Sequence, residues 1–167
     1  MQEKLTRGGG KKTGQNFEIQ MKIIVDTNII FSALLNSNGR IGRLLLDSRD
    51  KFQFYSCKYL QKEIYRHREK IKHHSKLNDI DLSELISIIE SRIFFIDENL
   101  LPNDVIVKAK DWVADVDFDD FAFVAIANHL DAWLWTGDKK LTVGLRQKGY
   151  QRVISTSDLW DILEMKL

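Results

Sequence analysis

Short apolar runs rich in β-branched residues alternate along the chain with longer segments whose apolar residues recur every three or four positions. The first pattern is typical of buried strands and the second of amphipathic helices. Strands are expected at residues 22–25, 51–55, 93–96, 132–135 and 151–154. Helices are expected at residues 29–35, 41–47, 58–74, 82–91, 102–114 and 121–130, from residue 139 onward, and at 157–165. This alternation predicts a parallel sheet covered by helices on both faces, the α/β class.

Two serines and the single proline are expected at the starts of helices. Ser56 is a plausible N-cap for the helix predicted at residues 58–74, because its hydroxyl can accept from a free N–H group. Pro102 suits the first turn of its helix, and Ser157 is expected to open the last one.

The chain is expected to hold one folded domain after a short extension. Its 167 residues fit a single domain with a sizeable core. Residues 1–20 contain Gly8–Gly10 and the pair Lys11–Lys12 with little apolar periodicity. We therefore expect a flexible N-terminal extension, or sequence upstream of a start at Met21, followed by a domain at 21–167.

Composition narrows the class of protein without naming a partner. The chain is 44% hydrophobic and 29% charged with a net charge of +1, so any binding to nucleic acid must come from a local patch. Its single cysteine, Cys57, excludes an internal disulfide and fits a reducing compartment. No apolar run approaches the roughly 20 residues that span a bilayer, and no signal-peptide core is found. A cytoplasmic protein that makes no use of a membrane is expected.

Acidic side chains stand where the predicted strands end or where the facing helices begin. These acids are Asp26, Glu63, Asp117, Asp119, Asp120 and Asp138. Because ligands bind beyond the carboxyl ends of parallel strands, we expect the acids to share a pocket there. Carboxylates packed together repel one another unless low pH or a cation relieves them. An oxygen-only ligand set favours Mg²⁺ or Mn²⁺.

Each of these acids also has a structural explanation. Asp26 can cap the helix that follows it, and Asp138 can form the turn after its strand. Glu63 can be a solvated helix residue, and one of the three aspartates near residue 120 is expected to act as a cap. Their joint placement at one sheet edge is what indicates a site. The sequence has no phosphate-binding Gly-rich loop, no Ser-His-Asp order and no reactive-cysteine setting.

Four blocks of sequence carry a resemblance to a known family. They are Ile23–Asn28, the helix bearing Glu63, Asp120 with Phe123–Ala127, and Leu134–Leu141. In these blocks the chain from Met21 to about Trp160 resembles the PIN domain, a family of metal-dependent ribonucleases. The resemblance implies a three-layer α/β/α sandwich with a mostly parallel sheet of four to five strands.

The resemblance also implies a site. Its catalytic acids fall on Asp26, Glu63, Asp120 and Asp138. Its metal ligands fall on Asp26, Asp120 and Asp138, with Asp117 as an accessory ligand. Sliding the pattern by one residue makes Asp119 the third acid instead. Candidate substrate contacts are Asn28, Thr136, Arg66 and Arg68. The implied activity is Mg²⁺- or Mn²⁺-dependent cleavage of single-stranded RNA, whose exposed backbone enters a narrow cleft more easily than an A-form helix.

Partners follow from the same resemblance. Many small bacterial and archaeal members look like toxins of toxin–antitoxin pairs and are usually dimeric. An antitoxin-like protein and a second copy of the chain are therefore candidate partners beside RNA.

Basic residues crowd the end of the helix that carries Glu63. They are Arg66, His67, Arg68, Lys70, Lys72, His73, His74 and Lys76. They can hold a phosphate backbone or form a solvated helix end, where cations suit the dipole, and the sequence slightly favours the second. The histidine pair has no nearby cysteine or third ligand that would indicate zinc. The four tryptophans are expected in the core rather than stacked on bases.

Two further functions stay open from the sequence. A phosphatase or phosphotransferase with an aspartyl nucleophile has a similar architecture, but such enzymes usually carry a second Asp where this chain has Asn28. A catalytically silent module that binds protein or RNA is the other alternative, and the intact set of four acids argues against it.

Overall fold

A five-stranded parallel sheet forms the middle layer of the protein. The computed structural model describes residues 19–115 and 118–165. Within these ranges the strand order is β3-β2-β1-β4-β5, and every neighbouring pair is parallel. The strands are β1 (Met21–Val25), β2 (Phe52–Cys57), β3 (Ile93–Ile96), β4 (Trp133–Trp135) and β5 (Val153–Ile154). The expected α/β/α sandwich with a parallel sheet is confirmed.

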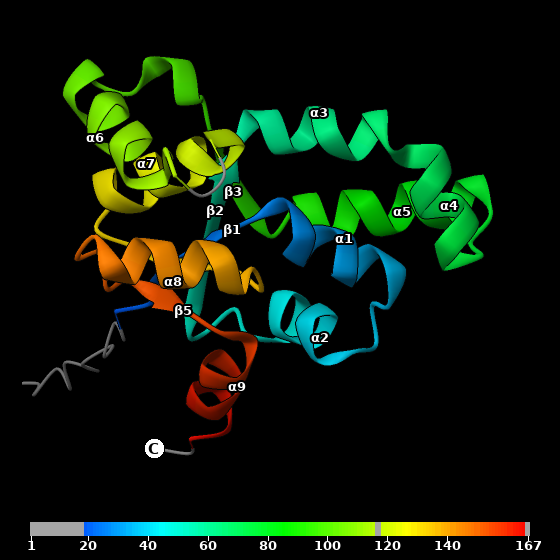
Figure 1. Cartoon of the computed structure of the whole chain (residues 1–167). Coiled ribbons are helices and arrows are strands. Elements are labelled where there is room, and N and C mark those ends of the chain that lie inside the picture. The colour runs from blue at the N-terminus through cyan, green and yellow to red at the C-terminus, as the bar shows by residue number, and fades with distance from the viewer. Residues whose placement is uncertain (1–18, 116–117, 166–167) are drawn as a thin grey trace, which may run out of the picture.

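Helices cover both faces of this sheet (Figure 1). Helices α6, α7 and α8 lie on one side, while α1, α3 and α5 lie on the other. The helices are α1 (Thr27–Leu35), α2 (Arg40–Asp47), α3 (Lys58–Arg66), α4 (Arg68–Ser75), α5 (Asp79–Glu90), α6 (Asn103–Val113), α7 (Phe121–His129), α8 (Lys139–Gln147) and α9 (Thr156–Glu164), with short 3₁₀ turns η1 (Glu98–Leu100) and η2 (Phe118–Asp120). The strand order explains this two-sided cover, because the chain proceeds from β1 to β2 and β3 in one direction and to β4 and β5 in the other.

The core is densest where β1, β4 and α7 meet. Ile23, Ile24 and Val25 of β1 are completely buried, as are Leu134 and Trp135 of β4. Helix α7 buries a continuous run of six residues, 122–127, which explains why its sequence is apolar all round rather than amphipathic. Strands β1 and β4 are therefore anchored in the core, and the core positions the residues that directly follow each of them.

Several helix boundaries differ from those expected. The helix predicted at residues 58–74 is two helices that meet at His67, whose φ and ψ are −98° and 11°. Neither Gly nor Pro marks this break, and both Ile64 and Ile71 are buried as a continuous helix would require. Periodicity therefore could not reveal it.

The residues at three helix starts also differ from those expected. Cys57, not Ser56, occupies the N-cap position of α3, because Ser56 is still in β2 and its hydroxyl donates to the Val25 carbonyl at 2.8 Å. Pro102 sits at the N-cap of α6 rather than in its first turn. The last helix begins at Thr156 rather than at Ser157, after a capping box in which the side chains of Ser155 and Asp158 accept from each other's backbone N–H groups.

None of the helices in residues 19–115 and 118–165 combines the length and the apolar character needed to cross a bilayer. The extension expected at residues 1–20 lies outside the described residues as far as residue 18.

The capping box predicts a specific difference between two neighbouring serines. Ser155→Ala should lower the free energy of unfolding by about 1 kcal/mol, since it removes the acceptor for the Asp158 N–H group. Ser157→Ala, at the start that the sequence pattern had indicated, should change stability by much less. Urea unfolding of both variants measures the difference, and equal losses would contradict the observed helix start.

Candidate metal and active site between strands β1 and β4

The strand order of the sheet reverses at one point, between β1 and β4. Strand β1 lies between β2 and β4. In open parallel sheets, ligands bind in the crevice at the carboxyl ends of the strands that flank such a point. Asp26 directly follows β1, and Asp138 lies three residues after β4. The topology thus brings to one edge of the sheet two acids that are 112 residues apart in the chain.

Both acids are fixed as helix N-caps. The Ile29 N–H group donates to Asp26 Oδ1 at 2.9 Å, and the Leu141 N–H group donates to Asp138 Oδ1 at 2.9 Å. Each carboxylate therefore faces the positive end of a helix, α1 or α8, where negative charge is favoured. The structural explanation expected for Asp26 is correct, and it leaves the second carboxylate oxygen of each side chain outside the cap.

Thr136 joins the two acids. Its hydroxyl oxygen accepts from the Asp138 N–H group at 3.0 Å and is hydrogen-bonded to the Asp26 carboxylate. Asp26 and Thr136 are each only 4% exposed. The Asp26 N–H group also donates to the Trp135 carbonyl at 3.4 Å, which fixes the strand ends to each other. The sequence placed Thr136 at the site, and the structure gives it a bridging position.

The Asp26 carboxylate is buried with a second negative charge nearby. Burial raises the pKa of Asp26, and the charge of Asp138 raises it further, while hydrogen bonds from Thr136 and from the Ile29 and Asn28 N–H groups lower it. In the described part of the chain, no Lys, Arg or His forms an ion pair with either acid. An oxygen-only pair of this kind fits a hard divalent cation, which would offset the repulsion.

Glu63 is placed on α3, where its carboxylate meets cations. Its side chain is 14% exposed, one carboxylate oxygen pairs with Arg66, and the other lies 3.4 Å from His67 Nε2. Sequence reasoning treated His67 only as one of a group of basic residues. Its position four residues after Glu63 was the available signal, because side chains at that spacing meet on a helix surface.

The aspartates near residue 120 lie at the start of α7. Asp120 is the N-cap residue of that helix without a side-chain cap bond, and Asp119 is more exposed. Asp117, the expected accessory ligand, lies outside the described residues. Among the residues described, no group of three or more His, Cys, Asp or Glu side chains is arranged to hold a metal ion. The observed convergence is thus that of Asp26 and Asp138.

The expected substrate contacts fall into different settings. Asn28 is exposed on the first turn of α1, two residues beyond Asp26. Arg66 lies over the Tyr59 ring at 6.0 Å and pairs with Glu63. Arg68 instead connects α4 to α5, since it donates to Ser83 Oγ at 2.8 Å and to the Asp79 carbonyl at 3.0 Å.

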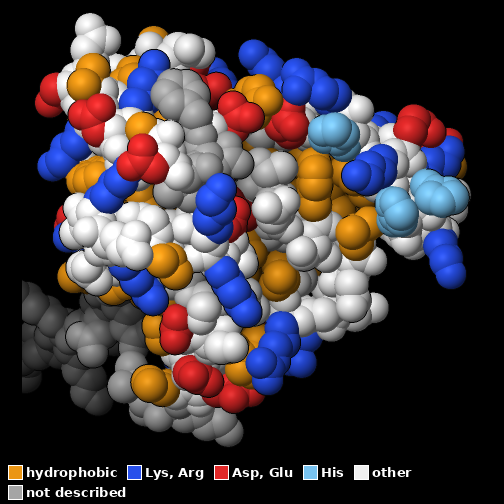
Figure 2. All heavy atoms as spheres, in the orientation of Figure 1, with side chains coloured by type: hydrophobic (Ala, Val, Ile, Leu, Met, Phe, Trp, Pro, Cys, Tyr) orange, Lys and Arg blue, Asp and Glu red, His pale blue; other side chains and the backbone are white. Residues whose placement is uncertain are grey.

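Figure 2 shows the histidine side chains gathered over the end of α3 and over α4, together with Lys and Arg side chains. Over the rest of this face, acidic and basic side chains are mixed. Cys57 offers no nucleophile beside the acids, because burial raises the pKa of its thiol to about 12 and only the thiolate is reactive.

Comparison with known proteins decides the family. A sequence profile of the PIN domain matches residues 24–157. The chain belongs to the PIN domain family. The matched segment begins within β1 and ends within α9, so it includes both Asp26 and Asp138.

Solved structures share the PIN fold of this chain at low sequence identity. A crystal structure of VapBC2 from Rickettsia felis bound to a DNA fragment from their promoter gives a TM-score of 0.60 at 14% identity, covering 81% of this chain and 98% of that one. The structure of PAE2754 from Pyrobaculum aerophilum gives 0.62 at 13% identity, covering 93% and 98%. These similarities concern the fold. The search of curated proteins found no match.

The buried Asp26 carboxylate predicts how stability depends on pH. Because the pKa of Asp26 is raised above its ordinary value of 3.8, the folded protein holds this proton more tightly than the unfolded chain does. The corresponding stability is present below pH 3.8 and is lost as pH rises through the raised pKa. In Asp26→Asn, which keeps an oxygen to cap α1, that loss should be absent.

The measurement is urea unfolding of wild type and Asp26→Asn in EDTA between acid and neutral pH. The variant should gain stability relative to wild type as pH rises. Asp161→Asn, at an exposed carboxylate on α9, controls for the general change in charge. A wild-type advantage that grows toward neutral pH would show that burial does not dominate at Asp26.

Proposed function

We propose that this PIN-domain protein is a Mg²⁺- or Mn²⁺-dependent endoribonuclease that hydrolyses single-stranded RNA. The observation that carries the proposal is the convergence of Asp26 and Asp138 on Thr136 at the switch point of the sheet. Among the described residues, neither carboxylate forms an ion pair with Lys, Arg or His, and a divalent ion bound by both would offset their repulsion. Family membership gives this chemistry its reaction class.

Each acid has a proposed role. Asp26 and Asp138 would hold the ion, with Asp120 as a further ligand and Asp117 as an accessory one. Glu63 completes the catalytic set by accepting a proton from the attacking water. When bound, the divalent ion supplies an acidified water and offsets charge on the phosphate under attack. Thr136 orients the Asp26 carboxylate through their hydrogen bond.

The charge distribution supports a modest and local contact with RNA. A net charge of +1 offers no broad cationic surface, but Arg66 lies beside Glu63 and can contact a phosphate next to the reacting one. Few neutralised phosphates predict a shallow dependence of affinity on salt. The proposed partners beyond RNA are an antitoxin-like protein and a second copy of the chain, as in the small toxin-like members of the family.

A silent module that binds RNA or protein is the second candidate, and one observation favours it. The described residues present no group of three or more potential metal ligands, and Glu63 is occupied by Arg66 and His67. In that case the acids serve the fold as helix caps, and the basic end of α3 and the adjoining α4 form the binding surface.

Divalent ions should stabilise the folded protein. At a free concentration about 100 times the dissociation constant, binding adds about 2.7 kcal/mol, or a rise in melting temperature of about 5–10 °C for a chain of this size. Asp26→Asn should lose most of this rise, while Asp161→Asn should keep it. A melting temperature that is the same with Mn²⁺, Mg²⁺ and EDTA would argue for the silent module.

Cleavage should require the ion and both converging acids. Wild type should cut single-stranded RNA with Mg²⁺ or Mn²⁺ and stop in EDTA. Asp26→Asn and Asp138→Asn should each lower the rate by more than about 100-fold, beyond the usual cost of losing an outer-shell partner of a metal ligand. The assay follows a labelled single-stranded RNA on a gel.

Identical purification of every variant controls for contaminating nucleases, because cleavage that persists equally in both variants belongs to a contaminant.

The same assay assigns the third acid. Asp120→Asn should abolish cleavage and Asp119→Asn should leave substantial activity. The reverse order would move the ligand by one residue, and equal losses would assign a role to both.

A further inference from the structure

An apolar groove opens between α1 and α4. Its volume is about 230 Å³, and its lining is mostly apolar. Phe31 and Leu35 of α1 line one side and Ile71 of α4 the other. Leu35 is 44% exposed, whereas Ile71 is buried at 3%. Figure 2 shows hydrophobic side chains uncovered here, next to the histidine and Lys/Arg side chains of α4.

Two residues connect this groove to the proposed active site. Asn28 lines the groove and stands two positions after Asp26 on the first turn of α1. His67 also lines it, and His67 Nε2 lies 3.4 Å from Glu63 Oε2. A molecule that occupies the groove therefore extends directly to the residues next to two of the candidate catalytic acids.

The groove has the chemistry of a site for a flat ring on an anionic backbone. Phe31 and His67 meet edge to face, with ring centroids 5.8 Å apart, so the groove presents two aromatic surfaces. Lys70 and His74 line it as well, and none of its lining residues is acidic. Its volume is below the roughly 300–1,000 Å³ of pockets for drug-sized ligands, which suits one planar ring.

One polar group lies at the end nearest the acids. The side chain of Asn28 is exposed, and among the described residues no hydrogen bond occupies its amide. An amide offers a donor and an acceptor together, which matches the mixed edge of a nucleobase. An aliphatic side chain of a protein partner would leave this amide without a partner.

We propose that the groove binds one unpaired nucleobase of the RNA, next to the phosphodiester that is cut. This inference rests on the proposed function and adds a base-binding subsite to it. The base stacks on Phe31, its edge meets Asn28, and Lys70 contacts the neighbouring phosphate. Base–aromatic stacking tolerates any base, so selectivity among bases comes from Asn28.

The test measures binding rather than cleavage. Full-length Asp26→Asn protein, which keeps the helix cap but is not expected to cut, is titrated against a short fluorescent oligoribonucleotide. A set of oligonucleotides carries one abasic position each, moved along the strand. One abasic position should weaken binding about ten-fold, the usual loss for one stacked base, and the other positions should have little effect.

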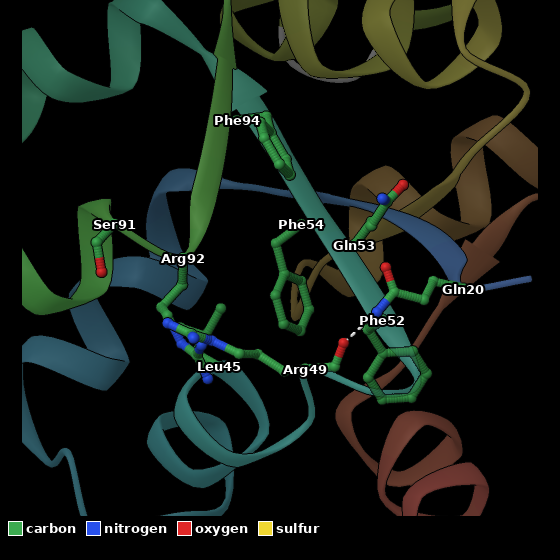
Figure 3. A pocket seen from close by; sticks show the side chains of 9 residues that line it. All are labelled: Gln20, Leu45, Arg49, Phe52, Gln53, Phe54, Ser91, Arg92 and Phe94. Carbon is green, nitrogen blue, oxygen red and sulfur yellow. Dashed lines mark hydrogen bonds between the residues drawn. The ribbon is translucent and has the colours of Figure 1, made fainter. Parts of the chain in front are cut away.

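Adding Phe31→Leu keeps an apolar side chain but removes the ring. It should weaken binding of the intact oligonucleotide to the same extent and abolish the difference between intact and abasic strands. Phe94→Leu is the matched control, because Phe94 is an exposed ring, at 58%, in a separate cavity at the opposite end of the sheet (Figure 3). It should leave both measurements unchanged.

Two exposed residues give readouts that do not depend on the ring. Lys70→Ala should weaken intact and abasic strands equally and lower the salt slope by about one. Asn28→Ala should reduce the preference among the four bases at the sensitive position. A preference left intact by this variant would overturn the assignment of base selectivity to Asn28.

Equal effects at all abasic positions, or an abasic effect that survives Phe31→Leu, would overturn the proposal. Binding unaffected by Phe31→Leu would also overturn it and leave the groove to a segment of a protein partner. Wild type that cuts RNA without a sensitive position refutes the subsite alone. A sensitive position in a protein that never cuts refutes the nuclease proposal and supports the subsite.

Discussion

The buried Asp26 carboxylate is the constraint on which the site depends. A negative charge that is 4% exposed is tolerated only when hydrogen bonds satisfy it, and three backbone or side-chain groups do so at the end of β1. One of them, Thr136, belongs to the strand end of β4. Burial of Asp26 therefore requires that β1 and β4 end together, and this places Asp138 beside it. The same arrangement that lets the fold accept the charge brings the second carboxylate close to the first.

Much of this arrangement could be predicted because its causes are local. The β-branched run at residues 22–25 and the apolar run at 132–135 are too short for helices and favour strands, and each is followed by an acid at a helix start. Parallel topology then brings the ends of central strands together without any knowledge of side-chain contacts. The sequence therefore predicted that Asp26 and Asp138 lie at the same edge of the sheet, and the structure places them there.

The features that could not be predicted depend on tertiary contacts rather than on local sequence. The division of the expected helix at His67 has no Gly or Pro signal, and both halves keep their apolar residues in register. The orientation of Glu63 depends on that division, since His67 ends α3 and its ring contacts both Glu63 and Phe31. Helical spacing placed Glu63 at the edge of a buried face. Spacing alone does not decide whether its carboxylate pairs with Arg66 and His67 or faces a metal ion.

The position of Glu63 bears on how a cation and RNA would act together under the proposed function. The Arg66 side chain is 59% exposed, and besides Glu63 it contacts the ring and the hydroxyl group of Tyr59. Water at the exposed guanidinium weakens its pairing with Glu63. Under the proposed nuclease function, a phosphate of the RNA would compete for Arg66, and a divalent ion held by Asp26 and Asp138 would attract the carboxylate that Arg66 releases. RNA binding and assembly of the proposed four-acid set would then favour each other, as linkage between two ligands requires.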